Sequence, residues 1–165
     1  ALGGDEKAIA RAQGVLDAIA TKQVYFGALG AGAAAKVINN AVAHAVMIVV
    51  AEAGAMATAS GVDTQKLIAL LSDAQMGLHR PLTYPYAHRI VKGDYAGFMP
   101  LYAARKDSVL ALQLAQTLNV PLFAIQGSHS VYDMGVAAGY GRDDYAAVAK
   151  LWADWGCPTV PTDKA

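Results

Sequence analysis

The sequence predicts a mainly α-helical domain that follows a short helix–strand segment. Apolar residues make up 55% of the 165 residues and charged residues only 16%, as in a globular domain that buries much of its surface. Residues 31–60 contain only two residues that disfavour a helix, Gly32 and Gly54. Further helical runs follow between Gly, Pro and Asp residues.

The N-terminal segment predicts one helix followed by one strand. Asp5 is placed to cap a helix that runs to about Ala20, with apolar residues at helical spacing. Lys22 to Phe26 is typical of a short strand, and Gly27 ends it. A single strand cannot form a sheet, so we expect its neighbours upstream and interpret the chain as part of a longer protein.

The long helix predicted from Ala31 to Ser60 would extend about 45 Å at 1.5 Å per residue. It is apolar on nearly all sides, so other surfaces must cover it. The part from Ala41 to Ala59 approaches the length of a membrane span, but it contains His44 and Glu52, and a carboxylate at mid-bilayer is costly. A buried helix in a soluble, oligomeric protein is the preferred interpretation.

The remaining segments predict further helices with recognisable starts and stops. Gly61-Val62-Asp63 ends the long helix and caps the next, and Pro121 suits the first turn of a later helix. We expect helices over residues 64–72, short helical pieces within 76–100, and helices over 101–118, 121–138 and from Asp143 or Asp144 to about Trp155.

Composition excludes several classes of function. The formal net charge is zero, and no basic stripe or cluster indicates binding to nucleic acid or to a membrane surface. The single cysteine, Cys157, cannot form an internal disulfide and points to the cytoplasm as the default compartment. His79, His88 and His129 show no metal-ligand spacing with acidic residues, so we expect no metal site.

The glycine-rich segment after the predicted strand has two interpretations. Gly30-x-Gly32-x-x-Ala35 matches a dinucleotide-binding fingerprint, and Glu52 lies about where a ribose-binding acid is expected. In such a unit, however, the acid ends a second strand. Here Glu52 lies inside the same predicted helix, so the match is weak evidence for a phosphate cradle.

The longer pattern Gly27-x-x-Gly30-x-Gly32-x-x-x-Lys36-x-x-x-Asn40 resembles the catalytic motif of the β-hydroxyacid dehydrogenases. That family includes 3-hydroxyisobutyrate dehydrogenase and tartronate semialdehyde reductase. Other short segments resemble the family in the same order and spacing: Gly3-Gly4-Asp5, Ala51-Glu52-Ala53 followed by Gly61-Val62-Asp63, Lys106-Asp107 after Phe98, and residues 139–144.

The resemblance implies a particular domain organisation. Residues 1–28 would be the remnant of an N-terminal dinucleotide-binding domain, contributing its last helix and strand. Residues 29–157 would form a helical substrate and dimerisation domain like the C-terminal domain of 6-phosphogluconate dehydrogenase. Residues 158–165 are expected to be a loose tail. Gly30 and Gly32 would then serve as a hinge before the long helix.

Lys36 and Asn40 lie four residues apart, and therefore on one face of the predicted helix, with Asn39 beside them. Oxidation of an alcohol by hydride transfer requires removal of the hydroxyl proton, and a lysine in a suitable environment can accept it. The resemblance implies that Lys36 is the general acid/base and that Asn40 and Asn39 position the substrate. A hydrogen-bonded core histidine is the preferred interpretation of His44.

The resemblance also implies NAD or NADP as cofactor, bound mainly by the missing N-terminal domain. Lys106 would help to close the site over the cofactor, and Phe98 would pack against it. The sequence departs from the family here, because Arg105-Lys106-Asp107-Ser108 stands where the family more often has Lys-Asp-Leu.

The function implied is the interconversion of a small 3-hydroxy acid and its semialdehyde by an NAD(P)-dependent dehydrogenase. These 165 residues alone are expected to be inactive. A homodimer or higher homo-oligomer is expected, both from the family and from the apolar long helix. The alternative is a non-catalytic helical oligomerisation module, which explains the long helix but not the spacing of Lys36 and Asn40.

Overall fold

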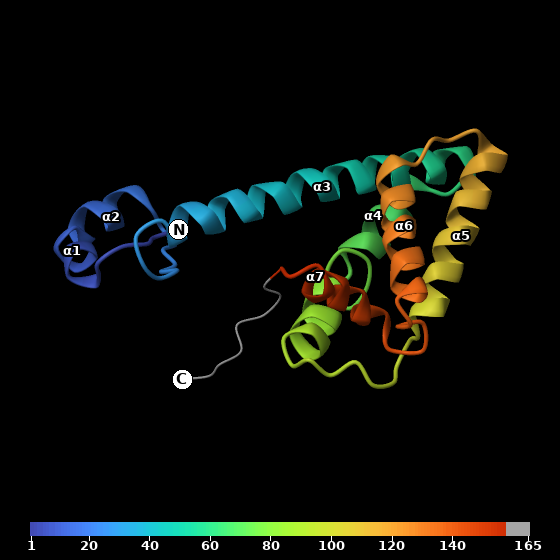
Figure 1. Cartoon of the computed structure of the whole chain (residues 1–165). Coiled ribbons are helices and arrows are strands. Elements are labelled where there is room, and N and C mark those ends of the chain that lie inside the picture. The colour runs from blue at the N-terminus through green and yellow to red at the C-terminus, as the bar shows by residue number, and fades with distance from the viewer. Residues whose placement is uncertain (158–165) are drawn as a thin grey trace. The chain divides into compact units, whose positions relative to one another are not determined.

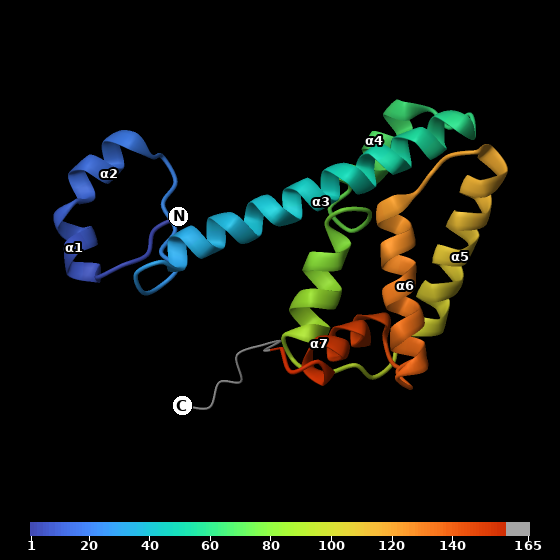
Figure 2. The same ribbon diagram turned by 45° about the horizontal axis from the view of Figure 1, so that its top comes forward.

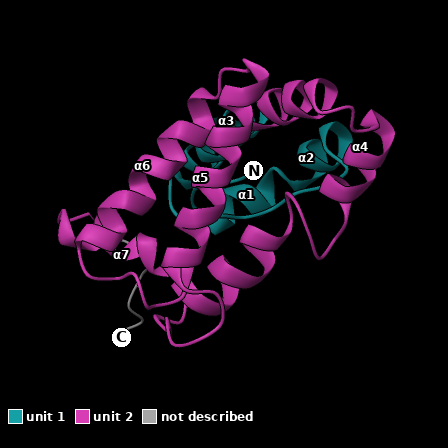
Figure 3. Ribbon diagram, turned by 90° about the vertical axis from the view of Figure 1, so that its right-hand side faces the viewer, with its two compact units in different colours: residues 1–48 teal, residues 49–165 magenta. Residues whose placement is uncertain are grey.

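A computed structural model describes residues 1–157 of the chain. These residues form two compact units, one comprising residues 1–48 and the other beginning at Val49 (Figure 3). Regular structure in the described residues is helical, which confirms the predicted mainly α class. The predicted tail, residues 158–165, lies outside the described residues.

The first unit begins with two short helices, α1 (Glu6–Arg11) and α2 (Gln13–Ile19). The predicted cap is confirmed, because Asp5 Oδ1 accepts a hydrogen bond from the Ala8 amide at 2.8 Å. The prediction of one continuous helix to Ala20 is wrong. At Ala12 the turn tightens, because its N–H donates to the carbonyls of both Ala8 and Ile9. The first helix ends there and α2 begins at the next residue.

The strand predicted over residues 22–26 is reduced to a single parallel bridge between Leu2 and Tyr25. The Leu2 amide donates to the Val24 carbonyl at 2.8 Å, and the Phe26 amide donates to the Leu2 carbonyl at 2.9 Å. Among residues 1–157 no further stretch joins this pair, so the pairing ends after one bridge. The segment is extended backbone rather than a strand of a sheet.

Helix α3 (Ala31–Ala59) has 29 residues, which confirms the predicted long helix. By length and composition it is apolar enough to cross a membrane. Its C-terminal part nevertheless belongs to the second unit, where Glu52 and Ala57 are buried. A buried carboxylate that contacts another helix is typical of a packed helical domain.

The second unit continues with α4 (Thr64–Ser72), the π-helix η1 (Leu82–Ile90), α5 (Leu101–Leu118), α6 (Phe123–Ala137), the 3₁₀ helix η2 (Tyr145–Ala149) and α7 (Lys150–Asp154). Helices α5 and α6 run side by side, as Figures 1 and 2 show. The predicted helix over residues 101–118 is confirmed. The core of the unit consists of small and aliphatic side chains, among them Leu101, Ala104, Ala115, Leu122, Ala146, Ala147 and Leu151.

Close packing of α6 against the start of α5 depends on Gly135. A Cβ atom added at Gly135 would lie 2.7 Å from Leu101 Cδ2, closer than two carbon atoms can approach. Leu101 itself has no exposed surface. The missing side chain of Gly135 therefore makes room for the most deeply buried leucine of the unit.

The region predicted to contain short helical pieces forms the π-helix η1, which includes Pro85. Pro85 has no amide hydrogen, so it cannot continue an α-helical ladder. Hydrogen bonds between residues five apart follow, from the Val91 amide to the Tyr86 carbonyl and from the Asp94 amide to the Arg89 carbonyl. Side chains five residues apart are consequently brought close together in this segment.

Glu52 of α3 caps the N-terminus of α6. Its carboxylate, only 7% exposed, accepts hydrogen bonds from the amides of Phe123, Ala124 and Ile125 at 2.6, 2.7 and 3.1 Å. The expectation that Glu52 has a buried, structural partner is confirmed. The prediction that Pro121 lies in the first helical turn is wrong, because α6 begins at Phe123, where the carboxylate satisfies the free amides.

Two further aspartates cap helices in the second unit. Asp63 accepts from the Lys66 amide at 2.9 Å, as the sequence predicted. Asp144 accepts from the Ala146 amide at 2.9 Å and is the capping residue of the final helical segment. The predicted start at Asp144 and end near Trp155 are confirmed, but the segment is divided into η2 and α7, so the prediction of a single helix is wrong.

Replacing Glu52 with glutamine should destabilise the second unit by about 1–3 kcal/mol, since the charge opposite the helix dipole is lost while the side-chain shape is kept. Urea unfolding followed by circular dichroism would measure this. Glu6→Gln, at an exposed carboxylate in the first turn of α1, is the matched control and should change the free energy of unfolding by only about a few tenths of a kcal/mol. Equal stabilities for Glu52→Gln and the unmodified protein would contradict the capping role.

Candidate functional site

The glycine-rich segment forms the turn that starts α3. Gly27 and Gly30 have φ values of +115° and +94°, in the region that favours glycine. Gly32 is buried within α3, and a Cβ atom there would lie 2.7 Å from the carbonyl carbon of Leu2 and 2.9 Å from the Gly3 nitrogen. Gly32 is therefore required by the close approach of the N-terminal backbone.

This packing speaks against the dinucleotide fingerprint. A phosphate cradle needs open space beside the glycine at the helix start. At Gly32 that space is filled by the backbone of Leu2 and Gly3. The segment does not fit a bound pyrophosphate, and its glycines instead shape a tight turn before Lys36.

Lys36 and Asn39 lie one turn apart on α3 and line the same pocket in the first unit. The pocket has a volume of about 270 Å³, and its wall also includes Lys22 and the apolar side chains of Val24 and Phe26. It combines a lysine, an amide and a second ammonium group with an apolar wall. This is the kind of surface that can hold a small polar molecule by one end.

Other predicted residues on α3 lie outside this pocket. Asn40 is exposed and does not line it, although it follows Asn39 directly. His44 is exposed as well, so the interpretation of His44 as a buried core residue is wrong for the described chain. Among the described residues, side chains 38–45 of α3 are all exposed, so no packed core forms around His44.

The two residues predicted to contact the cofactor belong to the second unit. Lys106 is 66% exposed on α5, and its Nζ lies 3.0 Å from Asp107 Oδ1. Phe98 is 58% exposed and has a φ of +65°, which is unusual for a residue with a large side chain. Both side chains are accessible to a ligand, and both remain predictions as cofactor contacts.

Phe98 belongs to an aromatic cluster that sequence reasoning missed. Its ring centroid lies 5.1 Å from that of Tyr84, and the guanidinium carbon of Arg80 lies 5.3 Å from the Phe98 ring. Arg80 also approaches Tyr145. Burial raises the pKa of the Tyr145 hydroxyl, as do Tyr132 and Asp144, whereas Arg80 lowers it. The cluster joins residues far apart in the chain, and no periodic pattern marks them.

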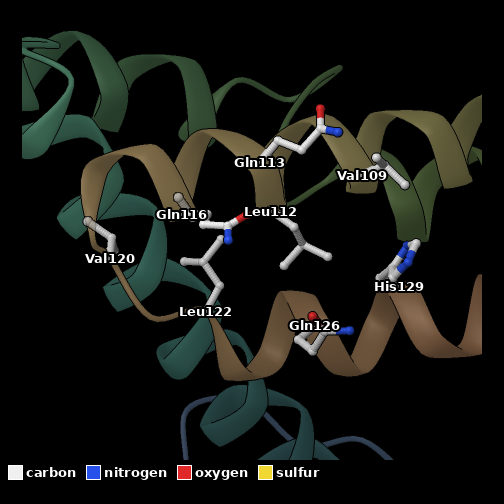
Figure 4. Close-up of a pocket in the computed structure, with 9 residues that line it drawn as sticks. Val109, Leu112, Gln113, Gln116, Val120, Leu122, Gln126 and His129 are labelled. Carbon is white, nitrogen blue, oxygen red and sulfur yellow. The ribbon is translucent and has the colours of Figure 1, made fainter.

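A groove of about 350 Å³ lies between α5 and α6 (Figure 4). Three glutamines and several aliphatic side chains line it, and His129 lies at one end. His129 Nδ1 lies 2.9 Å from Ser108 Oγ, while the Ser108 hydroxyl donates to the Arg105 carbonyl at 2.7 Å. Since the hydroxyl proton is committed to that carbonyl, Ser108 is not an activated nucleophile, and the contact joins the two helices.

Among residues 1–157, no group of three or more histidine, cysteine, aspartate or glutamate side chains is arranged to hold a metal ion. Two ion pairs of the second unit connect separate segments of the chain. Arg105 pairs with Asp133, and Lys150 pairs with Asp143.

Comparison with known proteins identifies the family. The sequence model described as the NAD-binding region of NADP-dependent 3-hydroxyisobutyrate dehydrogenase matches residues 30–152, about three quarters of the chain. The chain belongs to the 3-hydroxyisobutyrate dehydrogenase family. The matched region includes Lys36, Phe98 and Lys106, and it excludes the α1–α2 segment.

Curated relatives of this family match most of the chain at about 30% identity. They include 2-(hydroxymethyl)glutarate dehydrogenase of Eubacterium barkeri, 29% identical over 92% of this chain and 50% of the relative. The 3-sulfolactaldehyde reductase of Escherichia coli is 29% identical, over 88% and 49%. Mouse mitochondrial 3-hydroxyisobutyrate dehydrogenase is 30% identical, over 89% and 45%. The chain thus spans about half the length of these relatives.

Solved structures share the fold. An imine reductase from Pseudomonas sp. superposes with a TM-score of 0.79 at 23% identity, covering 90% of this chain and 52% of the other. An imine reductase variant from Myxococcus stipitatus, solved with NAD+, gives 0.78 at 18% identity, covering 90% and 53%. At these identities the likeness shows the fold alone.

Gly32→Ala should destabilise the protein by about 1–3 kcal/mol, because the new methyl group would overlap the Leu2–Gly3 backbone. Thermal and urea unfolding would measure the change. Gly54→Ala in the same helix is the matched control, since nothing lies within 4 Å of its added Cβ. That control should stabilise the helix by about 0.5–1 kcal/mol. If both variants behave alike, the close approach at Gly32 is not what selects glycine.

Proposed function

We propose that this chain supplies the lysine-bearing part of an NAD(P)-dependent β-hydroxyacid dehydrogenase. The enzyme would interconvert a small 3-hydroxy acid and its semialdehyde. The observation that supports this most is the placement of Lys36 and Asn39 in one pocket within a chain of the 3-hydroxyisobutyrate dehydrogenase family. The helical part would have the fold of the 6-phosphogluconate dehydrogenase C-terminal domain.

Lys36 is the proposed general acid/base. In the direction of oxidation, a neutral Lys36 Nζ accepts the proton of the substrate hydroxyl as the C–H bond breaks. The O–H bonding pair becomes the second bond of the carbonyl, and the hydride released from carbon would be taken up by the oxidised cofactor. In the direction of reduction, the ammonium form returns that proton to the oxygen. Such proton transfer typically contributes a factor of about 10²–10⁴ in rate.

Neighbouring side chains support this chemistry in different ways. Asn39 lines the Lys36 pocket, and its amide can donate or accept a hydrogen bond to a substrate oxygen. Asn40 follows on the same helix and is the second proposed positioning residue. Lys22 adds a further positive charge to the pocket, which can pair with an acid group of the substrate.

The cofactor in this proposal is NAD or NADP, whose nicotinamide accepts or supplies the hydride when bound. The filled space at Gly32 supports binding of its pyrophosphate mainly by residues outside this chain. Within the chain, the exposed Lys106 and Phe98 are the residues that would contact it. The compounds in the names of the curated relatives have an acid group together with a hydroxyl or an aldehyde, which supports the proposed substrate class.

Lys36→Ala in the complete protein should lower kcat by about 10²–10⁴ while leaving the thermal unfolding temperature unchanged. Lys36→Arg should be similarly impaired, because a guanidinium keeps its proton and cannot act as a base. The assay would use 3-hydroxyisobutyrate, glycerate and small semialdehydes with both cofactors. The exposed Lys66→Ala, on α4, is the matched control and should retain activity.

Near-normal turnover by either Lys36 variant would remove Lys36 from the mechanism. Lack of turnover by the unmodified protein with every acid and cofactor would instead favour the alternative, a non-catalytic oligomerisation module. The family match does not favour that alternative, since its named relatives are dehydrogenases and a reductase.

We further propose that the protein is a cytoplasmic homodimer, or a higher homo-oligomer, formed through α3. Apolar side chains on this helix are more than half exposed in the single chain: Val37, Ile38, Val42, Met47 and Ile48. Apolar side chains exposed to this extent around a helix favour burial against a partner, and a second copy of the chain provides apolar side chains of the same kind.

Size-exclusion chromatography with light scattering should therefore give at least twice the mass of one chain. Met47→Glu should lower the measured mass toward that of one chain, because it places a charge in the contact. Val62→Glu, at an exposed apolar residue outside α3, is the matched control and should keep the dimer. A single-chain mass for the unmodified protein at all concentrations would refute self-association.

A further inference from the structure

The guanidinium of Arg80 lies over two adjacent aromatic rings in the second unit. Its guanidinium carbon lies 5.2 Å from the ring centroid of Tyr84 and 5.3 Å from that of Phe98. The two rings lie 5.1 Å apart and are tilted by 47°. Contacts of this length are attractive and restrict a side chain that is otherwise mobile.

A second arginine shares the Tyr84 ring but differs in its partners. Arg89 lies 5.6 Å from the ring centroid and donates to the Tyr84 hydroxyl at 3.3 Å. It also pairs with Asp94 at 3.1 Å and approaches the buried Asp144 at 4.0 Å. Arg89 therefore has carboxylate partners and a hydrogen-bonded structural role.

Arg80 has no such partner among residues 1–157. Both nearby carboxylates face Arg89, and within the described part of the chain none forms an ion pair with Arg80. Its side chain is only partly exposed. An arginine whose position is restricted, but whose N–H donors have no acceptor among the described residues, can bind an acceptor from outside the chain.

The backbone next to the cluster adopts unfavourable conformations. Phe98 adopts a φ of +65° directly after Gly97 at +75°. For a side chain of this size such a conformation is unfavourable, and it persists where other contacts hold it. Tyr84 is placed by the π-helix η1, so two unusual backbone segments bring the rings to Arg80.

We propose that Arg80 is an oxyanion-binding residue, with the rings of Tyr84 and Phe98 as its support. Both rings lie on one side of the guanidinium carbon, and on the side away from them the planar fork of N–H groups can donate to two oxygens of a carboxylate, sulfonate or phosphate. Two sources share this chemistry: a small organic acid and a phosphate of the cofactor. The site rests on the cluster itself and does not require Lys36 to be catalytic.

The test follows the Nε–Hε signal of Arg80 by NMR in the ¹⁵N-labelled chain, with Arg80→Gln used to assign it. Acetate, methanesulfonate and NADPH are titrated separately. We expect a saturable shift of the Arg80 signal, whereas exposed Arg142 should shift little and without saturation. Saturation by acetate or methanesulfonate identifies an organic acid as the source, and saturation by NADPH alone identifies the cofactor.

No shift of Arg80 with any of the three, or the same unsaturable shift at Arg80 and Arg142, would overturn the proposal. Arg80→Lys keeps the positive charge but removes the paired N–H groups of the guanidinium. For whichever of acetate, methanesulfonate or NADPH saturates the Arg80 signal, the Kd measured by calorimetry should rise about ten- to hundredfold in this variant. An unchanged Kd for Arg80→Lys would also overturn it. Arg142→Gln is the matched control for loss of a surface charge. Binding is read without turnover, so this result is separate from the assay of Lys36.

Discussion

The cap that Glu52 places on α6 is the interaction on which the second unit depends. A buried carboxylate would be costly without partners, and three amides at the start of α6 supply them. This contact fixes the end of the long helix to a segment 71 residues away. Once α6 is placed, Gly135 admits Leu101, and α5 packs alongside. These three hydrogen bonds explain why α3 carries a carboxylate in the middle of an apolar stretch.

The start of α3 is held by a different kind of contact. Gly32 lies against the backbone of Leu2 and Gly3, and Lys36 follows one turn later. Steric fit, rather than a phosphate, accounts for the glycines in this segment. Because Lys36 and Asn39 extend from a helix whose start is fixed by backbone packing, their position beside Lys22 is set by rigid local structure.

Features encoded by neighbouring residues could be predicted from the sequence. The caps at Asp5 and Asp63 and the long helix α3 have local signals, and the structure confirms them. The start of α6 was misplaced at Pro121, because the carboxylate that determines it lies on α3. The cluster around Arg80 was missed for the same reason. A cation over two adjacent rings is a product of tertiary packing and is not marked by a regular spacing in the sequence.

The central claim is that Lys36 transfers the proton of the substrate hydroxyl. A crystal structure of the complete protein with a 3-hydroxy acid and NAD(P) bound would test it most directly. The account predicts that Lys36 Nζ lies within hydrogen-bond distance of the reacting oxygen, about 2.6–3.2 Å, with Asn39 or Asn40 on the same molecule. A bound substrate whose reacting oxygen contacts another proton-transferring group, with Lys36 directed to solvent, would contradict it.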